Sequence, residues 1–280
     1  MANAATAGTV DIGGDLLVNR LGFGAMRITG DGIWGPPRDH GAALTVLRRA
    51  VEMGVNFIDT ANSYGPQVSE NLIAEALLPY PDDLVIATKA GLERPGPNRW
   101  TPNGRPEYLV AECEGSLRRL GLEQIPLFQL HRPDPKVPLT DSVGALVQLK
   151  EQGKIRHIGL SNVSEAEIRE AQQVATIVSV QNRYNVNDRD SESIVDLCEA
   201  DGLAFLPWAP IREARGNRAV DELAQRYGAT PYQVVLAWLL ARSPAVLPIP
   251  GTSTPAHLEE NVAAVDLALM PEDVASLTNG

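Results

Sequence analysis

Apolar positions occur along the chain as short uninterrupted runs rather than as alternating positions. Eight runs are rich in Val, Ile, Leu or Phe, and they cover residues 20–26, 55–60, 84–89, 126–131, 155–161, 177–182, 203–208 and 246–251. A continuous apolar run is typical of a strand that is buried on both faces, as in a parallel sheet. The pattern therefore predicts eight buried strands.

Segments with helical periodicity lie between most of these runs. The clearest places Ala43, Val46, Leu47 and Ala50 on one apolar stripe and stops at Gly54, a residue type that commonly ends helices. Helices are predicted at residues 39–54, 108–121, 142–153, 164–175, 190–202, 230–243, 254–265 and 270–280.

Strand and helix alternate along the whole chain, without a linker or a break in composition. Roughly eight such units over about 250 residues favour a (β/α)₈ TIM barrel, an α/β fold, and we expect one barrel domain over residues 1–280. A doubly wound sheet is the alternative, but "GFGAMRITGDG" at 22–32 does not open a helix as a dinucleotide fingerprint must. Residues 9–22, with Gly13 and Gly14 between two strand-like runs, predict a hairpin that caps the bottom of the barrel, and a short tail ends the chain.

Composition narrows the class of protein. The chain has 280 residues, 44% of them hydrophobic, and its net charge of -11 disfavours nucleic acid or an anionic membrane as a partner. Cys113 and Cys198 have no C-x-x-C spacing, which is typical of a reducing compartment. The N-terminus has no export signal pattern, and no apolar stretch approaches about 18 residues. We therefore expect a cytoplasmic protein with a small-molecule ligand, either a monomer or a weak homo-oligomer.

Four titratable side chains follow the predicted strands. Asp59, Lys89 and His131 end three of them, and Tyr64 comes five residues after the acid. Each alone has an ordinary interpretation: a helix cap, a lysine that reaches solvent, a rim histidine and a packed tyrosine. Because the carboxyl ends of barrel strands meet in one cleft, these residues would converge there and need to pair with one another.

Such a cluster is suited to proton transfer. A tyrosine has a pKa near 10, and a nearby ammonium such as that of Lys89 lowers it, while Asp59 would keep the lysine charged. His131 would orient the same reacting oxygen. The four histidines do not cluster in sequence, so no metal site is expected.

Other strand ends offer groups that suit a cofactor. Ser161, Asn162 and Gln181 carry hydroxyl and amide groups suited to a carboxamide, and Trp208 offers a flat face for a planar ring. After the eighth strand, the segment 251–253 precedes a helix start, where backbone N–H groups favour a phosphate. Ser and Thr before Pro are also simply good helix starts, so this last motif is weak by itself.

Taken together, the motifs resemble those of a known family. "GFGAM", "FIDTANSYG", "ATKAG", "LFQLHRPD", "IGLSN", "VQNRYN" and "IPGTSTPAHLEEN" occur in order, and the chain resembles the aldo-keto reductases over essentially its whole length. The resemblance implies a (β/α)₈ barrel that binds NADP(H) and reduces an aldehyde or ketone to an alcohol by hydride transfer. It also implies that Asp59, Tyr64, Lys89 and His131 are the catalytic tetrad, with Tyr64 as proton donor.

The resemblance further implies where the cofactor binds. The implied contacts are Gly24, Ala25, Met26, Asp59, Ser161, Asn162, Gln181, Trp208, Ala209, Pro210, Ile211, Arg212, Arg215, Gly251, Thr252, Ser253, His257, Glu260 and Asn261. Many members carry a basic residue after the eighth strand for the 2′-phosphate, but this stretch has only His257, so NAD(H) is the alternative cofactor. Arg212, Arg215 and Arg218 either grip the pyrophosphate or are ordinary solvated loop arginines.

The expected substrate pocket is open and aromatic. The sequence ends with "MPEDVASLTNG", so we expect it to lack the long closing loop of many members, and Trp34 and Trp100 would line the pocket unless each only packs its own loop. "GDGIWGPPRDH" and "LPIPGTSTPAHLEENVAA" are most similar to the bacterial pyridoxal-reductase-like branch. Pyridoxal is therefore the first candidate substrate, with other aldehydes and ketones as alternatives.

Two other functions remain open at this point. A nicotinamide-binding regulatory or redox-sensing subunit would use the same fold with little turnover. A lyase or isomerase on the same barrel would need phosphate or metal groups at the rim.

Overall fold

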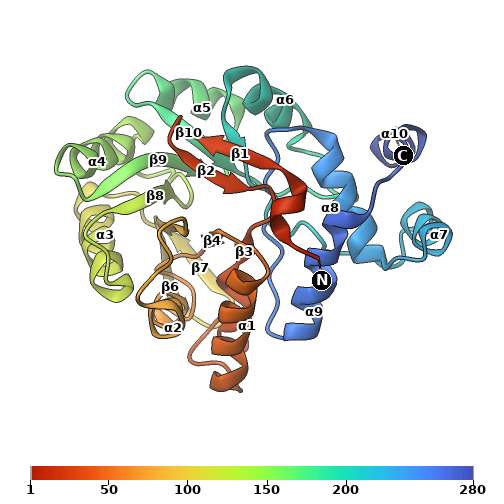
Figure 1. Cartoon of the computed structure of the whole chain (residues 1–280). Helices are drawn as coiled ribbons and strands as arrows, with labels where there is room; N and C mark the ends of the chain where they lie inside the picture. The colour runs from red at the N-terminus through yellow and green to blue at the C-terminus, as the bar shows by residue number, and fades with distance from the viewer. Residues whose placement is uncertain (1, 280) are drawn as a thin grey trace.

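Seven parallel strands form the central sheet of this computed structural model, which describes residues 2–279 (Figure 1). Their order in the sheet is β11-β10-β9-β8-β5-β4-β3. Their bounds are β3 Phe23–Gly24, β4 Phe57–Asp59, β5 Val85–Ala90, β8 Ile125–Leu130, β9 Ile155–Ser161, β10 Ile177–Gln181 and β11 Ala204–Phe205. All seven overlap predicted strands, although β5 ends one residue after its predicted run and β8 begins one residue before its own. Met1 and Gly280, included in the predicted domain, lie outside the described residues.

The eighth predicted strand, residues 246–251, closes the sheet into a barrel. On one side the Leu247 amide donates to the Phe205 carbonyl of β11 (2.8 Å), and on the other the Gly22 amide, just before β3, donates to Pro248 (2.9 Å). Pro248 and a second proline two residues later have no N–H, so the segment cannot form a regular ladder. The predicted (β/α)₈ barrel is confirmed.

Helices surround this barrel, as Figure 1 shows. The α-helices are α1 His40–Glu52, α2 Val68–Leu77, α3 Pro106–Leu120, α4 Leu139–Glu151, α5 Glu165–Gln172, α6 Glu192–Asp201, α7 Arg218–Tyr227, α8 Pro231–Arg242, α9 Pro255–Val262 and α10 Pro271–Asn279, with 3₁₀ helices at Ala4–Ala7, Ala25–Ile28 and Ala263–Asp266. Within residues 2–279, no helix is both long and apolar enough to span a membrane.

The sequence analysis missed α2 and α7. In α2 the buried face includes Ser69 and Glu70 beside Leu72, so its apolar stripe is interrupted. In α7 only Val220, Leu223 and Ala224 are buried, which leaves most of the helix polar. Periodicity of apolar residues cannot identify a helix whose buried face is polar or narrow.

The N-terminal hairpin covers the lower end of the barrel. Strands β1 (Thr9–Ile12) and β2 (Leu16–Asn19) pair antiparallel and lie across the centre of the strand ring in Figure 1. Ile12 and Val18 are fully buried in one cluster with Phe57, the first residue of β4. Since these contacts are with the start of the strand, the predicted cap at the bottom is confirmed.

A second hairpin, which the sequence analysis did not predict, lies beyond the carboxyl end of β5. Its strands are β6 (Leu92–Gly96) and β7 (Arg99–Pro102), and they pair antiparallel. Asn98 in the connecting turn has a φ of 53°, a left-handed conformation that asparagine tolerates well. The hairpin brings Trp100 to the carboxyl end of the barrel, as described below.

Barrel closure depends on a close approach of two glycines. A Cβ atom on Gly251 would lie 2.5 Å from the carbonyl oxygen of Gly24, a backbone atom that cannot move without opening the barrel. We expect Gly251→Ala to lower the free energy of unfolding by about 1–3 kcal/mol, measured by urea denaturation. Gly144→Ala is the control, because nothing lies within 4 Å of the added Cβ and helix propensity there favours alanine. Equal stability of the two variants would contradict the close approach.

Candidate active site

Lys89 occupies the interior of the barrel with no exposed surface. Strand β5 carries it, and its Nζ donates to Asp59 Oδ2 at 2.7 Å, to the Thr60 carbonyl at 2.8 Å and to Tyr64 Oη at 3.4 Å. The three acceptors match the three N–H donors of an ammonium group. The buried charge is therefore paired and fully hydrogen-bonded, and the predicted Asp59, Lys89 and Tyr64 lie together.

Two glutamines hold the other oxygen of the Asp59 carboxylate. Gln181 Nε2 donates to Oδ1 at 2.9 Å and Gln129 Nε2 donates to the same atom at 3.2 Å. Gln181 was predicted to bind the carboxamide of the cofactor. In the structure its side-chain nitrogen donates a hydrogen bond to Asp59 instead. Gln129 was missed, although its position two residues before His131 places both on the same face of the strand.

His131 completes the group of four predicted titratable residues. Its ring centroid lies 5.8 Å from that of Tyr64, in an edge arrangement, and its Nδ1 is 3.4 Å from the Ser63 hydroxyl. Asp59, Tyr64, Lys89 and His131 are all buried, with 7% or less of each exposed. The structure thus brings together the four residues at the carboxyl end of the barrel.

Burial sets the protonation states of this cluster. Burial raises the pKa of the Tyr64 phenol, and the Lys89 ammonium only partly offsets the rise. The sequence-based expectation that Lys89 lowers the pKa of Tyr64 is therefore correct for the local effect and wrong for the net direction. Burial alone would lower the pKa of Lys89, but Asp59 and Tyr64 raise it above its ordinary value. At neutral pH the phenol is protonated and the ammonium is charged.

Burial also affects the imidazole. Burial, with the nearby Lys89 and the arginines at 94 and 132, holds the pKa of His131 well below its ordinary value. The ring is neutral at physiological pH and retains one N–H donor. A neutral imidazole can donate a hydrogen bond to a substrate oxygen without adding a second buried positive charge.

This low pKa predicts a specific pH dependence. Since His131 stays neutral, we expect kcat/KM to show no loss from imidazole protonation between about pH 8 and about pH 6. Stability should behave differently: the unfolded imidazole, with a pKa near 6.5, binds a proton that the folded one does not, so stability falls as the pH drops below about 6.5. The first expectation is tested by measuring kcat/KM as a function of pH, and the second by measuring the free energy of unfolding as a function of pH. A kcat/KM decline near pH 6.5 that disappears in His131→Gln would contradict the neutral assignment.

Asn162 links the predicted nicotinamide residues into one network. Its Oδ1 accepts from Trp208 Nε1 (3.1 Å) and Arg132 (3.3 Å), and its Nδ2 donates to Ser161 Oγ and to the His131 carbonyl (both 3.0 Å). The residue has a φ of 58°, which asparagine adopts more readily than most residues. Trp208 is half-buried.

The loop after β11 contains further predicted cofactor contacts. Ala209 has a φ of 53°, and its carbonyl accepts from Asn185 Nδ2 at 3.1 Å, which fixes a strained peptide at the rim. Pro210 is buried and Ile211 half-buried. The three loop arginines are exposed and have partners within the chain: Arg212 with Glu213, Arg215 with the Tyr232 ring, and Arg218 with Glu222. These contacts favour the ordinary interpretation of the arginines.

The predicted phosphate segment lies at the junction of the first and eighth strands. Thr252 is buried and its Oγ1 accepts from the Thr254 amide (3.1 Å), while Ser253 is exposed. Arg27, from the 3₁₀ helix that follows β3, was missed: its Cγ lies 3.7 Å from where a Cβ on Gly251 would be. The exposed Arg27 brings positive charge to a segment that lacks a basic residue of its own.

The remaining predicted contacts lie on α9 and after β3. Asn261 is buried, His257 is exposed, and Glu260 Oε1 is buried without a hydrogen-bond partner among the described residues. Ala25 is buried and Met26 half-buried beside the buried Gly24. A buried carboxylate oxygen with no partner is a feature that a ligand's donor group would satisfy.

The two predicted substrate residues lie around an arginine. Trp100 is 6.3 Å from Tyr64 and 6.3 Å from His131 between ring centroids, so it borders the group of four directly. Trp34 and Trp100 both lie against the Arg94 guanidinium, at 5.6 and 3.7 Å from ring centroid to Cζ. Arg94 was missed because it belongs to a hairpin that the sequence pattern did not reveal.

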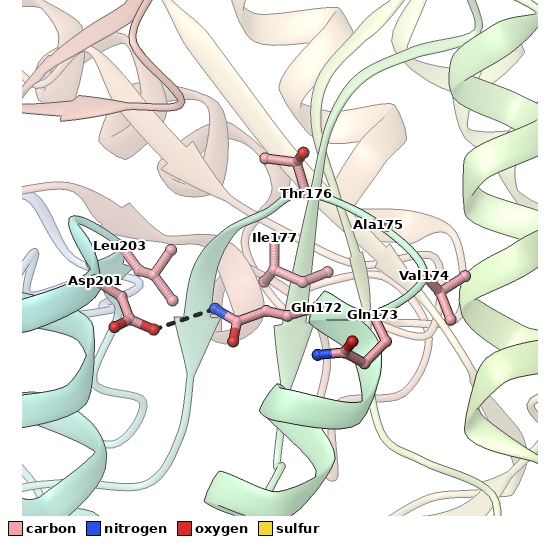
Figure 2. A pocket seen from close by; sticks show the side chains of 8 residues that line it. All are labelled: Gln172, Gln173, Val174, Ala175, Thr176, Ile177, Asp201 and Leu203. Atoms are coloured by element: carbon pink, nitrogen blue, oxygen red, sulfur yellow. Dashed lines mark hydrogen bonds between the residues drawn. The ribbon is translucent and has the colours of Figure 1, made fainter.

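A separate surface hollow of about 590 Å³ lies far from this group, at the starts of β10 and β11. Figure 2 shows its lining, where Gln172 Nε2 donates to Asp201 at 3.2 Å. Asp201 is also paired with Arg169. Across residues 2–279 no group of three His, Cys, Asp or Glu side chains is arranged to hold a metal ion.

The barrel and its buried group of four define a class of protein. The chain matches the Aldo/keto reductase family over residues 20–279, and it belongs to that family. It is 50% identical to an uncharacterized oxidoreductase of Schizosaccharomyces pombe over 98% of this chain and 90% of the relative. It is 44% identical to pyridoxine 4-dehydrogenase of Escherichia coli over 93% of this chain and 94% of the relative.

A solved structure agrees. The aldo/keto reductase from Klebsiella pneumoniae in complex with NADP and acetate is 26% identical, with a TM-score of 0.82 over 97% of this chain and 94% of that one. The family expected from the sequence motifs is confirmed, and the chain is an oxidoreductase of a family that acts on carbonyl groups with nicotinamide cofactors.

Proposed function

We propose that the chain reduces an aldehyde or ketone to an alcohol with NADPH, and that Tyr64 donates the proton. The observation that carries the proposal is the fully buried Lys89 ammonium, 2.7 Å from Asp59 and 3.4 Å from the phenol of Tyr64. A protonated phenol beside a fixed cation is a proton donor whose conjugate base is stabilised at the moment it forms.

The described residues fit a nicotinamide dinucleotide. The half-buried Trp208, fixed by Asn162, offers an aromatic ring beside the polar Ser161, and the unpartnered Glu260 Oε1 marks a place for a donor group in the second half of α9. Arg27 would supply positive charge near the phosphate segment. When bound, NADPH supplies the hydride that the carbonyl carbon receives.

The chain's own residues then perform the proton chemistry. The neutral His131 donates a hydrogen bond that orients the carbonyl oxygen toward Tyr64, and the Tyr64 hydroxyl transfers its proton to that oxygen as negative charge develops. Lys89 stabilises the resulting phenolate, and Asp59, held by two glutamines, keeps the ammonium in position. Burial excludes water from this group, which strengthens each of these interactions.

Pyridoxal is the proposed substrate. The Escherichia coli relative is named pyridoxine 4-dehydrogenase, and oxidation of pyridoxine at that position yields pyridoxal, the aldehyde that the reverse reaction would reduce. Trp34 and Trp100 provide aromatic surface at the catalytic end for a planar ring. We further propose that the protein acts in the cytoplasm on this small molecule.

The experiment is a comparison of substrates and cofactors. Purified protein is given pyridoxal, benzaldehyde or butanal with NADPH or NADH, and nucleotide oxidation is recorded. We expect the highest kcat/KM with pyridoxal and NADPH. Turnover of simple aldehydes alone would contradict pyridoxal as substrate, and equal rates with NADH would contradict the preference for NADPH.

A further inference from the structure

Arg94 is fixed above the catalytic group by backbone carbonyls. Its Nη1 donates to Ser63 (2.8 Å), its Nη2 to Gly32 (2.9 Å) and its Nε to Arg99 (3.0 Å). These acceptors come from the loops after β4 and β3 and from β7. Because a guanidinium has five N–H groups, one on each terminal nitrogen remains outside these bonds.

The charge of Arg94 has no counterion among the residues that the structure describes. Among residues 2–279, no carboxylate lies within the 4.0 Å of an ion pair, although the net charge is -11. Arg94 is half-buried, and this burial lowers the pKa of the guanidinium. Three backbone carbonyls and two aromatic rings compensate part of this desolvation, and an anion at the two remaining N–H groups would stabilise the charge further.

Arg94 also lies next to the reacting groups. The Arg94 guanidinium lies 3.7 Å from the centre of the Trp100 ring, and the same ring lies 6.3 Å from the ring centroids of Tyr64 and His131. The Ser63 carbonyl that Arg94 holds belongs to the residue just before Tyr64. A substrate with its carbonyl at Tyr64 could therefore extend along Trp100 and reach Arg94.

We propose that Arg94 is an anion-binding specificity residue, and that the preferred substrates are aldehydes with a carboxylate or another anionic oxygen. The inference rests on the proposed reductase function. Arginine suits this role because its planar N–H groups match the geometry of a carboxylate. Its position is set by carbonyls and two aromatic rings, so little ordering is needed on binding.

The test uses two substrates that share the aldehyde and the ring, 4-carboxybenzaldehyde and its methyl ester, of which only the first is an anion. We expect the wild type to favour the acid, and Arg94→Met to reduce the acid-to-ester ratio of kcat/KM by about 10- to 100-fold, mainly through KM. Arg99→Met is the matched control, since it removes the same charge from an exposed side chain of the same hairpin. It should leave the ratio within about twofold.

Arg94→Lys separates charge from loop anchoring. It keeps the positive charge but cannot make all three carbonyl bonds, so it should retain more of the preference for the acid than Arg94→Met does. If both variants lose activity on acid and ester by the same factor, Arg94 only holds the loops and the proposal is overturned. An acid-to-ester ratio that falls equally in Arg99→Met would also overturn it. The preference for the acid would then come from the overall positive charge of the hairpin and not from a contact with Arg94.

A binding measurement keeps this inference separate from the reductase function. Calorimetric titration with 4-carboxybenzaldehyde needs no turnover, and we expect binding that Arg94→Met weakens and Arg99→Met does not. If neither substrate is reduced but this pattern holds, the proposed function fails and the anion site stands. Equal binding to wild type and Arg94→Met would overturn the anion site.

Discussion

Asp59→Asn is expected to lower the free energy of unfolding by about 3–5 kcal/mol, because it leaves the Lys89 ammonium buried without a carboxylate. Lys89 has no exposed surface, and its Nζ lies 2.7 Å from Asp59. In a chain of this size the loss corresponds to a melting temperature lower by roughly 10 °C. Denaturant unfolding measures the change, and a loss below about 1 kcal/mol would contradict a desolvated pair.

The same variant has a pH signature. Without Asp59 the pKa of Lys89 should fall in the folded state, so the unfolded chain would bind a proton that the folded chain does not. The stability of Asp59→Asn should therefore rise with increasing pH relative to the wild type. The double variant Asp59→Asn with Lys89→Met should recover most of the stability, because no unpaired charge remains. A double variant as unstable as the single one would assign the loss to packing.

Tyr64→Phe is expected to lower kcat by roughly 10²- to 10⁴-fold, the usual contribution of a positioned proton donor. The ring and its packing against Trp100 and His131 remain, so folding and nucleotide affinity should change little. Steady-state kinetics measure the loss of kcat, and titration with the nucleotide measures whether its affinity is unchanged.

Tyr108→Phe is the matched control for this experiment. The Tyr108 hydroxyl donates to the Leu92 carbonyl (3.1 Å) and accepts from Asn62 (3.4 Å), and burial raises the pKa of Tyr108 to about 12. It is a partly buried phenol outside the group of four, so its removal should cost about 1 kcal/mol of stability and little activity. Equal losses of kcat in both variants would contradict Tyr64 as the specific proton donor.

The barrel and the group of four could be predicted because both depend on local sequence. Each run of apolar residues reports a strand buried on both faces, and the fold places every strand's carboxyl end in one cleft. Asp59, Lys89 and His131 each end such a run, so their convergence followed from topology alone.

Other features depend on contacts between distant segments, which local patterns do not report. The guanidinium of Arg94 is held in place by backbone carbonyls of three separate segments. Arg27 reaches the phosphate segment only because the first and eighth strands are neighbours. The pKa of Tyr64 was misjudged for a related reason. A sequence shows which charge is near the phenol but not how completely the phenol is buried, and here burial has the larger effect.

The most direct test of the account is the transfer of deuterium from labelled NADPH. Purified protein is incubated with pyridoxal and NADPH that carries deuterium at both C4 positions of the nicotinamide, and the product is examined by mass spectrometry. The account predicts pyridoxine with one deuterium on the new alcohol carbon, formed far more slowly by Tyr64→Phe. Tight binding of NADPH with no labelled alcohol from pyridoxal or any other aldehyde would contradict the account and favour a nucleotide-binding regulatory protein.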